Sequence, residues 1–190
     1  MITQVLKERT QQLHEQAERA VDLPRRLKSV EDYASLLSRL HGFYSPLESR
    51  IEALSGCDGT QLDLLQRRKA YLIRQDLIAL GWSDEAVQKI ADCDQLPQIH
   101  DWPAALGCLY VLEGSTLGGK FIQKAVAGRL GLGAANGCAF FNGYGEQTGI
   151  RWHEFCQVVS DYSGTSPNDD QKIVESALET FRCFGEWIKC

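Results

Sequence analysis

Apolar residues return every three or four positions along most of this chain, the spacing that gathers side chains on one face of an α-helix. The apolar–polar alternation of a half-buried strand is scarce. The pattern therefore predicts an all-α fold. The 190 residues, 44% of them hydrophobic, suit one compact domain over residues 1–190 with a single active site.

Start and stop signals divide the chain into expected elements. Ser29, followed three residues later by Asp32, resembles a capping box, and Asp101 with Pro103 marks another helix start. Pro46 is expected to kink or split its helix. We expect a turn at 55–60 and a glycine-rich loop at 131–145. The expected helices cover about 3–21, 29–54, 61–81, 83–93, 102–130, 149–162 and the segment after 167.

Composition excludes several classes of protein. The 25 acidic and 20 basic side chains give a net charge of −5, and no basic footprint for nucleic acid is visible. The seven cysteines form no CxxC pair, which argues against a disulfide framework or a zinc site. No apolar run has the length of a signal sequence or a membrane span. We expect a soluble, unprocessed, cytoplasmic protein with no membrane partner.

The first expected helix carries a row of polar side chains. Lys7, His14 and Glu18 are separated by seven and four residues and share one helical face. At about 1.5 Å of rise per residue, Lys7 lies roughly 10 Å from His14 and Glu18 about 6 Å the other way. An ion at His14 and an anion near Lys7 fit one flat molecule of haem size. Spacing alone favours an ordinary surface histidine over a haem ligand.

Segment 102–130 is unusually rich in glycine for a helix. Gly107, Gly114 and Gly118 recur at seven and four residues, with Ser115 and Gly119 beside them. Each glycine costs a helix about 1 kcal/mol relative to alanine. Either a planar ligand lies against this backbone, or another helix packs closely on it. The spacing fits both explanations.

These two segments resemble the haem oxygenase family, specifically the compact bacterial branch that often accompanies bacterial phytochromes. The stretch LKERTQQLHEQAERA, residues 6–20, is similar to the family's proximal helix, in which a histidine ligates the haem iron. The resemblance implies that His14 is the axial ligand, Lys7 a contact of a haem propionate and Glu18 the partner of the histidine. The other histidines, His41, His100 and His153, lack this row.

The stretch LGCLYVLEGSTLGGKFI, residues 106–122, resembles the distal helix of bacterial members, whose glycines lie over the oxygen-carrying face of haem. This implies that Gly114, Ser115 and Gly118 position oxygen and water and that Gly119 contacts the haem. Arg151 is a further candidate for a propionate. Animal-type members carry an aspartate where Ser115 stands, so ordered water held by backbone groups and Ser115 would have to replace that acid.

The resemblance implies oxidation of haem to biliverdin with release of carbon monoxide and iron, haem being both cofactor and substrate. Molecular oxygen and an external reductant are needed, because the chain shows neither a flavin motif nor an iron–sulfur pattern. A ferredoxin or flavin reductase is the expected donor, and a phytochrome is a candidate acceptor of the bilin. The basic clusters at 25–28 and 67–69 are candidate docking sites for the donor, although such clusters are more often solvated helix faces. Two alternatives remain: a haem carrier or sensor, and a metal-free helical enzyme acting on thiamin-like molecules.

Overall fold

The computed structural model describes residues 1–54, 62–163 and 166–189, and all regular elements among them are helical, which confirms the all-α prediction. The turn expected at 55–60 lies outside the described residues. The elements are α1 (Ile2–Val21), α2 (Leu23–Arg26), α3 (Val30–Glu52), η1 (Leu65–Arg67), α4 (Ala70–Ala79), α5 (Asp84–Gln88), α6 (Trp102–Leu130), α7 (Ala139–Asn142), η2 (Gly145–Gln147), α8 (Thr148–Tyr162) and α9 (Pro167–Trp187).

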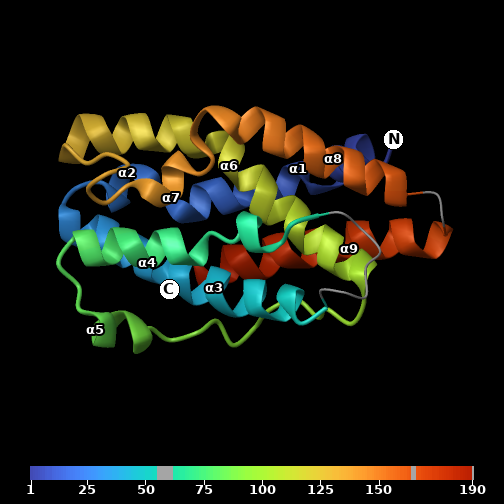
Figure 1. Ribbon diagram of the computed structural model, residues 1–190, viewed down its shortest axis with the longest axis horizontal. Helices are drawn as coiled ribbons and strands as arrows, with labels where there is room; N and C mark the ends of the chain where they lie inside the picture. The colour runs from blue at the N-terminus through green and yellow to red at the C-terminus, as the bar shows by residue number, and fades with distance from the viewer. Residues whose placement is uncertain (55–61, 164–165, 190) are drawn as a thin grey trace.

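Helix α6 crosses the middle of the molecule, with α8 along one side of it and α3 and α4 on the other (Figure 1). The most extensive helix pairings are those of α9 with α6 and with α1. Gly107 permits the first of these, because a Cβ atom there would come within 2.3 Å of the Ile173 carbonyl oxygen of α9. One of the glycines in the stripe therefore serves helix packing.

The predicted start signals are confirmed. Ser29 Oγ accepts a hydrogen bond from the Asp32 amide at 3.0 Å, and Asp101 Oδ1 accepts one from the Ala104 amide at 3.1 Å. These side chains satisfy amides that the first helical turn leaves without a partner. Helix α6 ends at Leu130 and is capped by Gly131, whose φ of 68° is the left-handed conformation that glycine adopts readily.

Pro46 was expected to kink or split its helix, and it does not split it, because α3 runs without interruption from Val30 to Glu52. Proline has no amide hydrogen, so Pro46 cannot bond to the carbonyl of Gly42 four residues earlier. That carbonyl instead accepts the Cys93 amide at 2.8 Å. The freed acceptor is satisfied by the segment that crosses α3.

Two other expected boundaries were wrong. The helix expected over 61–81 begins only at Ala70, because Arg68, which follows a short 3-10 turn at Leu65–Arg67, is extended and the Lys69 amide bonds to the Glu48 side chain. The loop expected at 131–145 contains the short helix α7. None of the described helices is long and apolar enough to cross a membrane.

Candidate functional site

The predicted proximal row lies on an accessible face of α1. The side chains of His14 and Glu18 are 52% and 68% exposed, and His14 Nε2 lies 3.6 Å from Glu18 Oε1. This separation is a contact rather than a hydrogen bond. Lys7, two turns earlier, is exposed as well. The structure thus places all three residues on one open face, and their contact with haem stays a prediction.

The imidazole of His14 is supported from one side by helix α9. Its ring meets the buried Phe181 edge-on, with 5.7 Å between centroids and an interplanar angle of 77°. Leu6 and Ala17, which are buried on another face of α1, anchor the helix to the core. Packing therefore restricts His14 while leaving it accessible.

The glycines of α6 fall into two groups. A Cβ atom on Gly119 would come within 2.3 Å of the Phe141 carbonyl oxygen, so this glycine is required by the approach of α7. A Cβ atom on Gly118 would have no atom within 4 Å apart from the adjacent backbone of its own helix, and one on Gly114 would meet only the Trp152 ring, at 3.6 Å. The two explanations of the stripe therefore apply to different glycines: Gly107 and Gly119 pack, and Gly118 is open.

Large apolar side chains lie exposed beside Gly118. Leu117 is 50% exposed and Phe121 is 76% exposed. With Gly114 and Gly118 they occupy positions i, i+3, i+4 and i+7, which form one helical face. A contiguous exposed apolar face on a helix marks a binding surface more often than a scattered residue does. This face of α6 has the character of a site for a flat apolar ligand.

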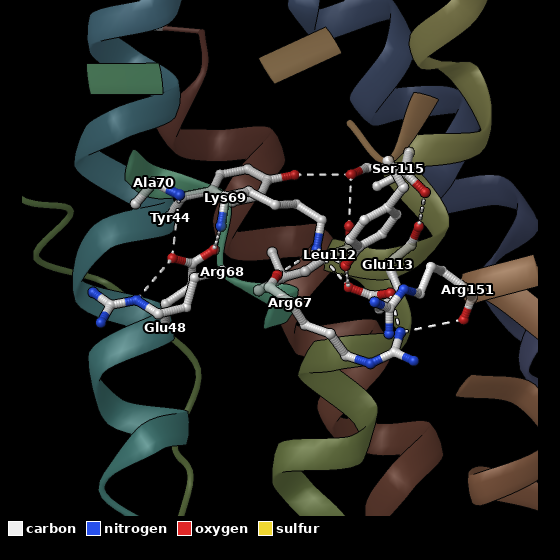
Figure 2. Close-up of polar contacts among 12 residues, drawn as sticks. Tyr44, Glu48, Arg67, Arg68, Lys69, Ala70, Leu112, Glu113, Ser115 and Arg151 are labelled. Atoms are coloured by element: carbon white, nitrogen blue, oxygen red, sulfur yellow. Dashed lines mark hydrogen bonds and ion pairs between the residues drawn. The ribbon is translucent and has the colours of Figure 1, made fainter. Parts of the chain in front are cut away.

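Ser115 makes two hydrogen bonds that the sequence did not suggest. Its Oγ lies 2.8 Å from the carbonyl oxygen of Leu112 in α6 and 2.9 Å from the hydroxyl of Tyr44 in α3 (Figure 2). Burial raises the pKa of Tyr44, so the phenol keeps its proton. Sequence reasoning missed Tyr44, because only the packing of α3 on α6 brings these residues together.

The ring of Tyr44 is held in turn by α7. Phe140 meets it edge-on at a centroid distance of 5.2 Å. The amides of Ala139 and Phe140 donate to the two carboxylate oxygens of buried Asp76 in α4, at 2.7 and 2.8 Å. Asp76 therefore fixes the start of α7, and α7 contacts both Tyr44 and Gly119.

A buried ion cluster is built around Glu113, two residues before Ser115 (Figure 2). Glu113 is 1% exposed and pairs with Arg67 at 2.6 Å and with Lys69, both 3% exposed. The Tyr144 hydroxyl donates to Glu113 at 2.8 Å. Glu48 accepts the Lys69 amide at 2.7 Å. The cluster ties residues 67–69 to α3 and α6, so Arg67 and Lys69 are neither on a solvated helix face nor available to dock a partner.

Arg151, the predicted propionate contact, has partners elsewhere. Its guanidinium donates to Gln66 at 2.7 Å and lies 3.6 Å from a carboxylate oxygen of Glu154, while its carbonyl accepts from Arg67 at 3.2 Å. The structure does not place it in the row of Lys7 and His14. Its role toward a propionate stays a prediction, one that requires these contacts to be exchanged.

The other histidines lie in different surroundings. His41 of α3 is partly buried, and burial lowers its pKa. Its Nδ1 has no hydrogen-bond partner within the described part of the chain. His100 and His153 are exposed, in the segment before α6 and in α8. Between residues 1 and 189, the described positions hold no cluster of three or more metal-ligating side chains.

Comparisons with known proteins agree on one family. The family model described as heme oxygenase matches residues 1–190. The heme oxygenase of Neisseria meningitidis, solved with NO and CO bound, superposes with a TM-score of 0.84 at 20% identity, covering 100% of this chain and 90% of that one. No curated protein matches the chain in sequence.

Two further solved structures have the same fold. Heme oxygenase 2 of Chlamydomonas reinhardtii, without heme, gives a TM-score of 0.75 at 17% identity, covering 100% of this chain and 96% of that one. The heme oxygenase of Leptospira interrogans gives 0.72 at 18%, covering 99% and 98%. Together with the match of the family model along the whole length, these findings establish that the chain belongs to the haem oxygenase family.

Proposed function

We propose that this haem-degrading oxygenase converts haem to biliverdin, with release of carbon monoxide and iron, using molecular oxygen and electrons from a separate protein. One observation carries the proposal. In a chain that matches the family model throughout, α9 packs against both α1, with its exposed His14, and α6, with its open glycine face.

The residues on α1 fit the metal and the acidic edge of haem. An accessible neutral imidazole is an ordinary ligand of haem iron, and His14 is accessible while its ring is held by Phe181. Lys7 lies on the same face, roughly 10 Å along the helix, where its ammonium group would hold a propionate. Glu18 would orient the imidazole.

The residues on α6 fit the opposite face of the porphyrin. Gly118 has no side chain to hold a flat ring away from the backbone, and Leu117 and Phe121 offer exposed apolar surface that would exclude water. Gly114 and Ser115 would position oxygen and a water molecule. Gly119 contributes by setting the distance between α6 and α7. When bound, haem supplies the iron that takes up oxygen and the porphyrin carbon that is oxidised.

Turnover separates this proposal from a haem carrier or sensor. Purified protein loaded with haemin and given ascorbate under air should lose its Soret band and form a bilin, identified by its absorption and by chromatography. A carrier would keep its Soret band under the same conditions. Failure to bind haemin at all would favour the metal-free helical enzyme.

A basic hollow near α1 is the docking surface that we propose for the electron donor. It has a volume of about 470 Å³ and is lined by Arg19, Arg25, Arg26 and Lys189 together with Ala20 and Asp22. Arg19 lies five residues beyond His14, about 7.5 Å along the helix. Positive charge at this surface, on a protein of net charge −5, would steer an acidic ferredoxin or flavin reductase toward the haem.

A charge reversal tests this surface. Arg25→Glu should slow ferredoxin-driven bilin formation at low salt at least roughly tenfold, while ascorbate-driven formation stays unchanged. Lys89→Glu, an exposed site at the end of α5, is the matched control. Equal slowing by both variants would contradict the docking site. Transfer of the bilin to a phytochrome is a further proposal that rests on the sequence resemblance.

A further inference from the structure

Two Asn–Gly pairs lie at the two ends of α7. Asn136–Gly137 precedes this helix, and Asn142–Gly143 closes it. Asparagine is a chemically labile residue, because the nitrogen of the following residue can attack its side-chain Cγ and close a five-membered ring. Glycine favours the attack, since it has no Cβ atom to crowd that nitrogen. The surroundings of each pair decide whether it can react.

The first pair is open to this reaction. Asn136 is exposed, and its Oδ1 accepts a hydrogen bond from the Gly133 amide at 2.6 Å. That donor polarises the side-chain carbonyl and stabilises the negative charge that develops on Oδ1 during the attack. In the described part of the chain the Gly137 amide has no acceptor. No hydrogen bond therefore has to break before the Gly137 nitrogen can attack.

The second pair is held by hydrogen bonds. The Gly143 amide donates to the carbonyls of Ala139 and Phe140, both at 3.1 Å. Asn142 is partly buried as the last residue of α7, and its Oδ1 accepts from Gln123 Nε2 at 3.3 Å. The end of α7 must open before the Gly143 nitrogen is free, and the free energy of that opening slows the reaction.

We propose that Asn136 is a site of spontaneous deamidation and that Asn142 is protected from it. The bond from the Gly137 nitrogen to Cγ of Asn136 forms, the amide proton is lost to solvent, and the side-chain nitrogen leaves as ammonia. Water then opens the ring without any oxidation or reduction. Attack of water on Cγ gives aspartate. Attack on the main-chain carbonyl carbon gives isoaspartate, whose main chain is one methylene group longer.

Isoaspartate at position 136 disturbs the start of α7. Gly137 is buried with a φ of 123°, and a Cβ atom there would lie 2.9 Å from a methyl group of Leu80, so this backbone has little room to shift. Two residues later, the Ala139 amide donates to Asp76 at 2.7 Å. An extra methylene group before Gly137 strains one of these two contacts. Aspartate keeps the length of the main chain and an acceptor oxygen, so it leaves both in place.

Incubation of the purified protein in mildly alkaline buffer tests the assignment, because ring closure requires loss of the amide proton. Peptide mapping by mass spectrometry should show a gain of one mass unit at Asn136 at least roughly tenfold faster than at Asn142. In urea the two rates should converge, since both glycine amides are then free. Asn136→Gln should abolish the main acidic species seen by anion exchange, because glutamine would need a six-membered ring, whereas the matched Asn142→Gln should not.

Equal rates at the two asparagines of the folded protein, or reaction at neither until urea is added, would overturn the proposal. Amide exchange measures the effect on α7. The isoaspartate fraction should exchange the Ala139 amide at least roughly tenfold faster than unmodified protein. Asn136→Asp, which matches the aspartate product, should exchange it at the unmodified rate. Unchanged protection of Ala139 in the isoaspartate fraction would refute the disturbance of α7.

Discussion

Gly119 of α6 lies directly against the main chain of α7, so that a Cβ atom on Gly119 would come within 2.3 Å of the Phe141 carbonyl oxygen. A Cβ atom on Gly118, one residue earlier, would have no atom within 4 Å apart from the adjacent backbone of its own helix. Adjacent glycines in one helix thus serve different purposes: one sets the approach of a neighbouring helix, and the other leaves the proposed haem face open.

Alanine substitutions at these two glycines should therefore have opposite effects. Gly119→Ala should lower the free energy of unfolding by about 1–3 kcal/mol, because backbone must move to admit the methyl group. Gly118→Ala should leave the haem-free protein unchanged or stabilise it by up to about 1 kcal/mol, yet weaken haemin binding. Urea unfolding and haemin titration measure the two effects, and similar destabilisation by both variants would contradict the division.

Asp76→Asn should loosen α7. Each carboxylate oxygen of Asp76 accepts one amide, and an asparagine would present an NH₂ group to one of the two donors. We expect a loss of about 1–3 kcal/mol in unfolding free energy and faster amide exchange at Ala139 and Phe140. Asp94→Asn, at an exposed position between α5 and α6, should change neither, and protection of both amides in Asp76→Asn would count against the capping role.

Glu113→Gln should be among the most destabilising conservative changes in the protein. It leaves Arg67 and Lys69, each 3% exposed, without the buried carboxylate that lies between them. Removing one partner of a buried ion pair typically costs about 3–5 kcal/mol. Glu146→Gln removes a carboxylate that is 98% exposed and should be neutral. Thermal unfolding compares the two, and equal melting temperatures would refute the claim.

His41 should make stability depend on pH. Burial lowers its pKa below 6.5, the Arg74 charge lowers it further, and the Asp92 charge partly offsets both. Between the folded pKa and about pH 6.5, the unfolded state binds more protons than the folded state. Stability therefore falls as the pH drops from about 6.5 through the folded pKa. The decrease in unfolding free energy between about pH 7.5 and 5.5 should be smaller in His41→Gln. An identical decrease would show that His41 does not contribute.

Periodicity and end signals predicted most of the fold. The all-α class and the caps at Ser29 and Asp101 were correct, because they depend on residues close together in the sequence. The errors came from distant partners. Cys93 satisfies the carbonyl that Pro46 frees, and Asp76 starts a helix in an expected loop. No local pattern contains those bonds.

The sequence also predicted part of the candidate site and missed part of it. The spacing of Lys7, His14 and Glu18 placed them on one face, and the structure leaves that face exposed. The glycine pattern was visible, although the sequence could not show which glycines pack and which stay open. Tyr44 was not predicted, since its bond to Ser115 joins α3 to α6 across 71 positions of the chain.

The axial-ligand spectrum of the haemin complex tests the central claim, that His14 holds the iron, most directly. His14→Ala should change the Soret and visible bands from those of an imidazole complex, and added imidazole should restore them. His41→Ala should keep the spectrum of the unsubstituted protein. An unchanged spectrum in His14→Ala, or the same change in His41→Ala, would contradict the assignment of the proximal ligand and the function built on it.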